Sequence, residues 1–331
     1  MKVCCNYNTA SSICGRSLTV SLKYRALEQA VRLSSHKSDL SFEGEERDAF
    51  LSWLSENRKT EVPYEYLMRH TDLAELNTPH CRTLILSPKR NASNTAVLYL
   101  YGGGFMNPPS KADYKLAVKI VEETGSDVYF PLYPLFPDRV MHETVEAVTE
   151  TVRRIHVQYP KDRTYVLGFS SGATLCLYLF LHLKQNGMND LMPGRWILNS
   201  PVLRLPPNED DLRNMRMIER YDAVLPVVFF TNEGLTGLMI EREDPSFRYL
   251  CDILAQDLHG MPKTDVYYGT HEIPYAYLEP FRKKCQAEGI RLRVHEGKLM
   301  MHCWGLYDVS KEGKAAQAEY LSIIRTRNTV K

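Results

Sequence analysis

The stretch that decides the fold runs from Thr164 to Gly187 and reads TYVLGFSSGATLCLYLFLHLKQNG. It begins with β-branched and aromatic residues, passes through the pentapeptide GFSSG at 168–172, and continues as a long apolar run. This order predicts a strand, a sharp turn and a buried helix. The pentapeptide matches the G-x-S-x-G turn that presents a nucleophilic serine, here Ser170, at the end of a strand. A purely structural turn serine is the alternative.

The composition excludes several classes of function. The 331 residues are 44% hydrophobic and carry a formal net charge of +1, so we expect a globular protein without a nucleic-acid partner. No stretch reaches the roughly 18 uncharged apolar residues that a membrane span needs. The first 20 residues contain no apolar run before a cleavage site, which argues against a signal peptide and for a cytoplasmic location.

The cysteines and histidines give no sign of a metal site. The eight cysteines are scattered along the chain, with no CxxC pair and no cysteine–histidine spacing suited to zinc. Reduced thiols are the expected state in a cytoplasm. We therefore predict a protein that needs neither a metal nor an organic cofactor.

In the rest of the chain, segments with the hydrophobic pattern of a helix alternate with segments that have the pattern of a strand. Helices are predicted at 21–31 and 44–57, before any strand, and so are expected to lie over the rest of the molecule. Further strands are predicted at 65–69, 82–86, 96–101, 127–130, 196–198, 264–268 and 290–295, and further helices at 111–124, 144–155, 277–288 and 312–326. The first two strands are expected to form a hairpin. Strands that alternate with helices predict an α/β fold with a mostly parallel sheet.

Active sites of such sheets lie at the carboxyl ends of the strands. Three glycines at 102–104 follow the strand at 96–101, and glycines let a backbone approach a ligand with its N–H groups pointing inward. The N–H groups of Gly103 and Gly104, with that of Ser171, could hold a developing oxyanion. A flexible turn is the alternative interpretation of the three glycines.

Two more candidate residues follow later strands. Glu272 comes after the strand at 264–268 and could orient a histidine, although it could also be a solvated loop residue next to His271. His302 comes after the last strand and could take a proton from Ser170 and return it to a leaving group. A packed histidine beside Met301 is the alternative. The order serine, acid, histidine is the one found in α/β hydrolases.

These motifs resemble the α/β-hydrolase superfamily, within the hormone-sensitive-lipase-like group of bacterial carboxylesterases. That group carries HGGG ahead of GDSAG, and this chain has YGGGF at 101–105 ahead of GFSSG. The segment YPLFPD at 133–138 resembles the group's YRLAPE, and the resemblance covers roughly residues 60–331. The chain departs from the pattern where Tyr101 replaces histidine, Phe169 replaces aspartate and Ser171 replaces alanine.

The resemblance implies an α/β-hydrolase fold with a helical cap. It implies that Ser170 is the nucleophile, His302 the general base and Glu272 the acid, with Gly103, Gly104 and Ser171 as the oxyanion hole. The expected division is a loose tail at 1–17, cap helices at 18–60, the first part of the core at 61–204, an inserted cap segment at 205–245 and the second part of the core at 246–331.

The function predicted from these residues is that of a serine carboxylesterase acting on small-molecule esters. The insertion is rich in methionine, which suggests a pocket for a modest acyl or aryl group, and short acyl esters such as acetyl esters are favoured. A silent ligand-binding protein of the same fold and an amidase with the same triad are the alternatives. The sequence leaves open whether the protein is a monomer or a homodimer.

Overall fold

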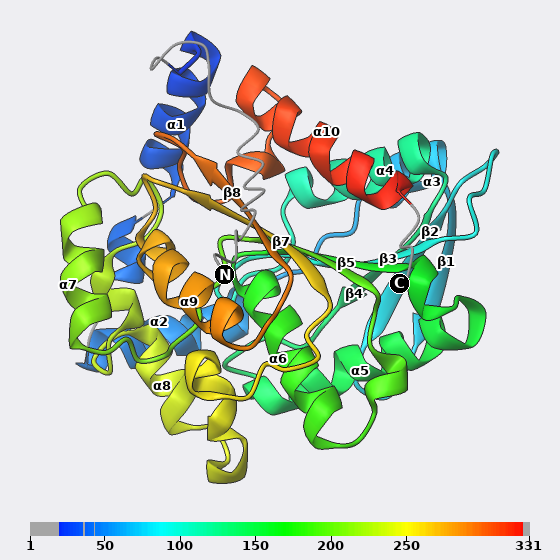
Figure 1. Ribbon diagram of the computed structural model, residues 1–331. Coiled ribbons are helices and arrows are strands. Elements are labelled where there is room, and N and C mark those ends of the chain that lie inside the picture. The colour runs from blue at the N-terminus through cyan, green and yellow to red at the C-terminus, as the bar shows by residue number, and fades with distance from the viewer. Residues whose placement is uncertain (1–19, 36, 43, 327–331) are drawn as a thin grey trace, which may run out of the picture.

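An eight-stranded sheet forms the centre of the computed structural model, which describes residues 20–35, 37–42 and 44–326 (Figure 1). The predicted tail at 1–17 lies outside the described residues. The strand order is β1-β2-β4-β3-β5-β6-β7-β8. The strands are β1 (Asp72–Asn77), β2 (Arg82–Ser87), β3 (Ala96–Leu100), β4 (Asp127–Leu132), β5 (Thr164–Phe169), β6 (Arg195–Asn199), β7 (Lys263–Gly269) and β8 (Leu292–Gly297). Only the β1–β2 and β2–β4 pairs are antiparallel, so the predicted mostly parallel sheet is confirmed.

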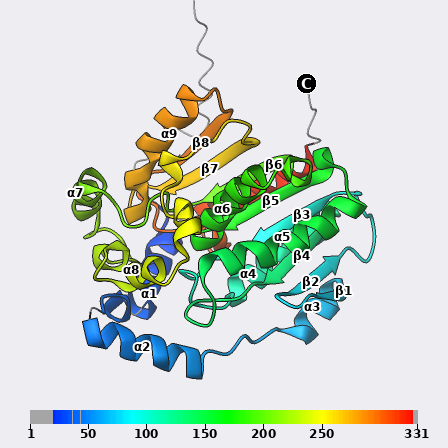
Figure 2. The same cartoon turned by 90° about the horizontal axis from the view of Figure 1, so that it is seen from below.

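Helices cover both faces of this sheet. The helices of the described chain are α1 (Leu22–Ser34), α2 (Gly44–Asn57), α3 (Tyr64–His70), α4 (Lys111–Thr124), α5 (Met141–Gln158), α6 (Ser171–Gln185), α7 (Glu209–Ile218), α8 (Leu235–Glu241), α9 (Leu278–Ala287) and α10 (Lys311–Arg325). Helices α4 and α10 lie on one face, and α5, α6 and α9 lie on the other (Figure 1). Both views place α1, α2, α7 and α8 together at one side of the sheet (Figure 2).

The prediction of a strand at 65–69 is wrong, because these residues belong to helix α3. The segment is rich in glutamate, leucine, methionine and arginine, which favour a helix, and Thr71 ends that helix. The predicted hairpin exists, but its first strand is β1, which begins seven residues further along. Strand β1 is an edge strand whose residues are at most half-buried, so it lacks the alternating apolar pattern that marks a strand.

Helix α4 begins and ends where its sequence predicts. Ser110 accepts a hydrogen bond from the backbone of Asp113, whose carboxylate accepts one from the backbone of Ser110, which completes a capping box. Gly125 ends the helix with a φ of 69°. The helix therefore fixes the path of the chain between β3 and β4.

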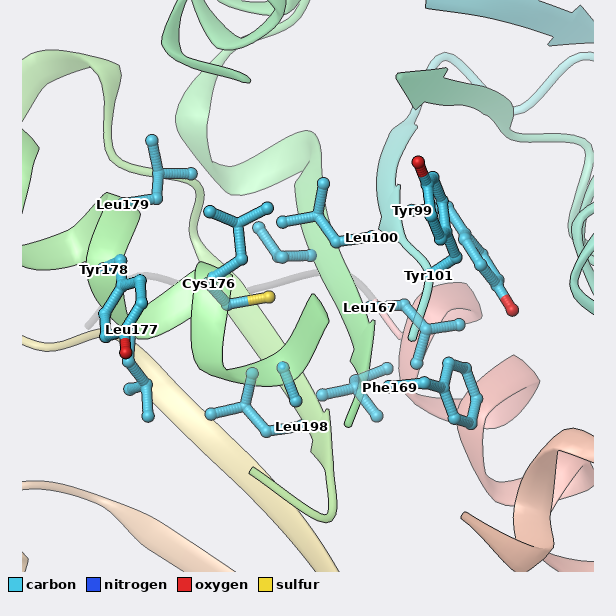
Figure 3. Close-up of a cluster of buried hydrophobic side chains, with 14 of the residues drawn as sticks. Tyr99, Leu100, Tyr101, Leu167, Phe169, Cys176, Leu177, Tyr178, Leu179 and Leu198 are labelled. Atoms are coloured by element: carbon cyan, nitrogen blue, oxygen red, sulfur yellow. The ribbon is translucent and has the colours of Figure 1, made fainter. Parts of the chain in front are cut away.

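The core on either side of β3 and β5 consists of large apolar side chains (Figure 3). Tyr99, Tyr101 and Phe169 lie on one face of the sheet, where the ring centroids of Tyr99 and Phe169 are 5.8 Å apart. Leu100 and Leu198 lie on the other face, toward Cys176 of α6 (Figure 3). Every residue of β3 and β5 is buried. Packing on both faces holds the ends of these two strands in place.

Among the described residues, no helix combines the length and the apolar content required to cross a membrane.

Candidate active site

Ser170 occupies the one-residue link between β5 and α6. Its φ of 51° and ψ of −124° are a backbone conformation that residues other than glycine rarely adopt. Its N–H donates to the Asn199 carbonyl oxygen at 2.8 Å, and its own carbonyl accepts from Ala173 at 2.9 Å. These bonds to a neighbouring strand and to the following helix hold the unusual conformation in place.

Both flanking glycines of the turn are required by close contacts. A Cβ atom on Gly172 would lie 2.2 Å from the carbonyl oxygens of Leu100 and Tyr101. A Cβ atom on Gly168 would lie 2.6 Å from the sulfur of Cys176. Helix α6 can therefore start directly against the end of β3 only because both positions lack side chains.

The three predicted triad residues form one hydrogen-bonded series. The Nε2 atom of His302 lies 2.8 Å from the Ser170 hydroxyl oxygen, and its Nδ1 atom lies 2.7 Å from a carboxylate oxygen of Glu272. The other carboxylate oxygen accepts the N–H of Gly269 at 2.6 Å. With Nδ1 donating to Glu272, Nε2 is free to accept the serine proton. These residues follow β5, β7 and β8, whose carboxyl ends meet at the same edge of the sheet.

The histidine and the glutamate are almost entirely removed from solvent. The exposed fraction of Glu272 is 0% and that of His302 is 7%. Burial raises the pKa of the Glu272 carboxyl, although its hydrogen bond to His302 opposes that change. Burial alone would lower the pKa of the His302 imidazole, but contact with Cys303 and Glu272 raises it by more, so it lies well above its ordinary value.

The glycine loop after β3 packs against the nucleophile. A Cβ atom on Gly102 would lie 3.1 Å from the Cβ of Ser170. Gly103 and Gly104 have φ values of 126° and 64°, which favour glycine. Within the part of the chain that the structure describes, the N–H groups of these two glycines donate to no protein oxygen. Ser171 is the first residue of α6, and a helix leaves its first N–H groups without helical partners.

Tyr101, which stands where the esterase group has histidine, forms a reciprocal pair with Tyr133. The two rings are stacked with centroids 4.2 Å apart and an angle of 7° between their planes. The Tyr133 hydroxyl donates to the Tyr101 carbonyl oxygen at 2.6 Å. This pair holds the end of β3, and therefore the start of the glycine loop, without an imidazole.

A cavity of about 480 Å³ lies over the serine. Its lining combines the elbow, the glycine loop and residues of the two helical segments, and includes Val31, Leu40, Gly103, Gly104, Ser170, Val202, Leu205, Val224, Leu225, Phe229, Phe230, Thr236 and His302. Among the described residues that line it, none is lysine or arginine. In the described part of the lining, the only carboxylate is that of Asp113, which accepts hydrogen bonds from the hydroxyl groups of Ser110 and Tyr99. The cavity suits an apolar group next to a hydrogen-bonding centre.

The methionines of the inserted segment do not line the cavity. Met215 and Met239 are buried outside the cavity lining, and Met217 is 63% exposed. The segment contributes Phe229 instead, whose ring would lie 3.1 Å from a Cβ atom on Gly104. The run VVFF at 227–230 was the available signal, since it is apolar within a polar insertion.

His271 has a different environment from His302. Its ring stacks on that of Tyr221, with centroids 4.8 Å apart, and it is not among the residues that line the cavity. The one described group with the geometry to share a metal ion consists of Asp257, His259 and Glu288. Two of these residues are exposed, and none lines the cavity.

Comparisons with known proteins agree on the family. A family model described as alpha/beta hydrolase fold matches residues 97–306. An esterase of Acinetobacter venetianus is 30% identical over 226 residues, which make up 67% of this chain and 70% of that protein.

Solved structures share the fold. One is an esterase from the bacterial hormone-sensitive lipase family, with a TM-score of 0.72 and 17% identity over 94% of this chain and 99% of that one. Another is an esterase/lipase from an uncultured bacterium, with a TM-score of 0.72 and 16% identity over 92% and 98% of the two chains. The resemblance inferred from the sequence motifs is thus confirmed. The chain belongs to the α/β-hydrolase superfamily, as a carboxylesterase-type hydrolase.

Proposed function

We propose that this chain hydrolyses carboxylic esters through an acyl-enzyme on Ser170. The observation that carries the proposal is the unbroken hydrogen-bonded series from Ser170 through His302 to Glu272. The Ser170 hydroxyl attacks the ester carbonyl while Nε2 of His302 takes its proton. The same proton then passes to the leaving alcohol. Water activated by His302 releases the acid and restores the serine.

The glycine loop provides hydrogen-bond donors for the negative charge that develops on the ester carbonyl oxygen. The free N–H groups of Gly103 and Gly104, together with that of Ser171, would bind the oxyanion of the tetrahedral intermediate. One such donor typically contributes about 3 kcal/mol to the stability of the transition state. The reaction needs no cofactor.

The helical segments at 18–60 and 205–245 act in this proposal as a cap. The cavity lining supports this assignment. Val31 and Leu40 of the first segment and Phe229 of the second contribute to it. An apolar lining without cationic side chains favours an uncharged acyl group over a carboxylate. Short acyl esters are the proposed substrates. A cytoplasmic location and the lack of a nucleic-acid partner remain predictions from the sequence.

The proposal is tested by the hydrolysis of p-nitrophenyl esters from acetate to decanoate. We expect turnover, with kcat/KM highest at the short end of the series and lower for decanoate. A fluorophosphonate probe should label Ser170, as mapped by peptide mass spectrometry. Failure of both the hydrolysis and the labelling would leave the ligand-binding alternative. Labelling without ester turnover, but with turnover of the matching p-nitroanilides, would favour the amidase.

Replacing Glu272 with Gln should lower kcat by about 10⁴-fold, as the loss of a triad acid does elsewhere. The amide no longer stabilises the imidazolium form of His302. Since activity requires neutral His302, the raised pKa of that residue places the rising limb of kcat/KM above about pH 6.5. Glu272→Gln should move that limb to lower pH, because it removes a group that raises the pKa. The measurement is a pH profile of kcat/KM for both proteins.

Glu243→Gln is the matched control for Glu272→Gln. The Glu243 side chain is also buried against a histidine, His142, but neither residue lines the cavity. This variant should lose thermal stability and keep its kcat. Equal losses of kcat in the two variants would contradict the assignment of Glu272.

A further inference from the structure

The cap reaches the backbone of both loops that carry the proposed acid and base. The first contact comes from Tyr24 in α1, whose hydroxyl oxygen accepts the backbone N–H of Met301. Met301 immediately precedes His302, and the exposed fraction of Tyr24 is 0%. A helix of the cap therefore supplies the hydrogen-bond acceptor for the peptide next to the histidine.

The second contact comes from Asp222, which lies between α7 and the short helix at Val227–Phe230. One of its carboxylate oxygens accepts the backbone N–H of Ile273 at 2.7 Å, and Ile273 immediately follows Glu272. The other oxygen accepts the N–H groups of Val224 and Leu225 at 2.7 and 2.9 Å. Asp222 is fully buried, so it joins the inserted segment to the acid loop where no water competes for either bond.

Other contacts also attach the cap to the rest of the molecule. Helix α1 is also tied to α10, because the carboxylate of Glu312 accepts from the backbone and hydroxyl of Ser21, both at 2.7 Å. The two cap segments are joined to each other through Arg32, which donates to the carbonyl of Tyr221 at 2.9 Å. Tyr24 and Asp222 differ from these anchors because their partners are the peptides beside His302 and Glu272.

We propose that Tyr24 and Asp222 are positioning residues, which set the His302 and Glu272 loops so that the imidazole lies between the carboxylate and the Ser170 hydroxyl. This inference rests on the proposed esterase function. Each residue acts on a buried backbone N–H group, and a buried donor that loses its acceptor moves or recruits another partner. Either response displaces the adjacent side chain, and a displacement of about 1 Å at a reacting group can cost 10²-fold in rate.

Two near-isosteric variants test this. Tyr24→Phe removes only the hydroxyl. Asp222→Asn keeps the shape but replaces one acceptor with an amide donor. If the remaining oxygen continues to accept from Val224 and Leu225, the NH₂ group faces the N–H of Ile273. Both variants should lower kcat for p-nitrophenyl acetate by about tenfold to a hundredfold, with KM changed by less than about twofold.

Each variant has a control that removes a cap anchor of similar type. Glu312→Gln weakens the α1–α10 anchor, and Glu219→Gln weakens a carboxylate bond to the backbone N–H of Val227 inside the inserted segment. Both controls should lower Tm as much as the test variants and leave kcat within about twofold of the parent. All rates are measured well below the lowest Tm and divided by the amount of folded protein, with the fluorophosphonate labelling rate of Ser170 as a second readout.

The outcomes separate positioning from simple support. A loss of kcat and of labelling rate in Tyr24→Phe and Asp222→Asn, but not in the controls, supports the inference. A kcat equal to that of the controls overturns it, and so does a rise in KM alone, since the cap would then serve only substrate binding. A test variant that fails to fold while its control folds also counts against it. Ester turnover that survives Ser170→Ala would instead refute the proposed function, which is a different result.

Discussion

Ser170→Ala lowers kcat for p-nitrophenyl acetate by about a million-fold, the loss seen when a triad serine is removed. The hydroxyl oxygen is the atom that forms the acyl bond, and alanine puts no other nucleophile at that place. The glycine loop and the cavity stay intact, so a residual rate of about 10³-fold over the uncatalysed reaction is expected from them. The measurement is the initial rate at saturating ester, corrected for spontaneous hydrolysis.

Ser126→Ala is the control for this result. Ser126 is fully buried, but it precedes β4, and its hydroxyl bonds Thr95 at the amino ends of the strands, opposite the site. Its loss should cost stability and leave kcat unchanged. Thermal unfolding of Ser170→Ala should give a Tm within a few degrees of the parent, since the turn keeps its backbone bonds. Full ester turnover by Ser170→Ala would refute the acyl-enzyme mechanism.

His302→Gln should have a nearly equal effect, a loss of about 10⁵-fold to 10⁶-fold in kcat. Glutamine can hydrogen-bond to the Ser170 hydroxyl, but it cannot carry the proton from the serine to the leaving group. Because one group serves both proton transfers, acylation and deacylation are both lost. Stopped-flow measurement of p-nitrophenol release should therefore show no burst.

His271→Gln is the matched control, since it makes the same change next to the proposed acid. The His271 ring stacks on Tyr221 and is outside the cavity lining, so its loss should change kcat by less than about threefold. If His271→Gln lost activity and His302→Gln retained it, the base would be assigned to the wrong histidine.

Much of the fold was predictable because several elements have strict local requirements. The elbow allows no side chain at Gly168 or Gly172, and the sequence provides none. The capping box of α4 and its terminal Gly125 were also visible as local patterns. Helix α3 was predicted as a strand because its five residues at 65–69 have mixed polarity and fit both the helical and the strand period. Only packing against neighbouring elements decides between helix and strand for so short a segment.

The candidate site was predictable to the extent that its residues follow strands. Parallel strands bring their carboxyl ends to one edge, so a serine, an acid and a histidine after three of them are expected to meet there. Tyr24 and Asp222 could not be found this way. Each is a single polar residue in a helix or a loop, and its partner is a backbone group more than 50 residues away. No local pattern encodes such a contact.

The contact between Tyr24 and Met301 also has a consequence for the order in which the molecule matures. The two residues are 277 positions apart, and Ser21 and Glu312 are 291 apart. During synthesis the elbow around Ser170 can fold long before the ribosome has made either Met301 or Glu312. Loops of this length close slowly. Helix α1 is made early, but it cannot form these two contacts until residues 301–312 have been made, so its docking beside His302 follows the folding of the elbow.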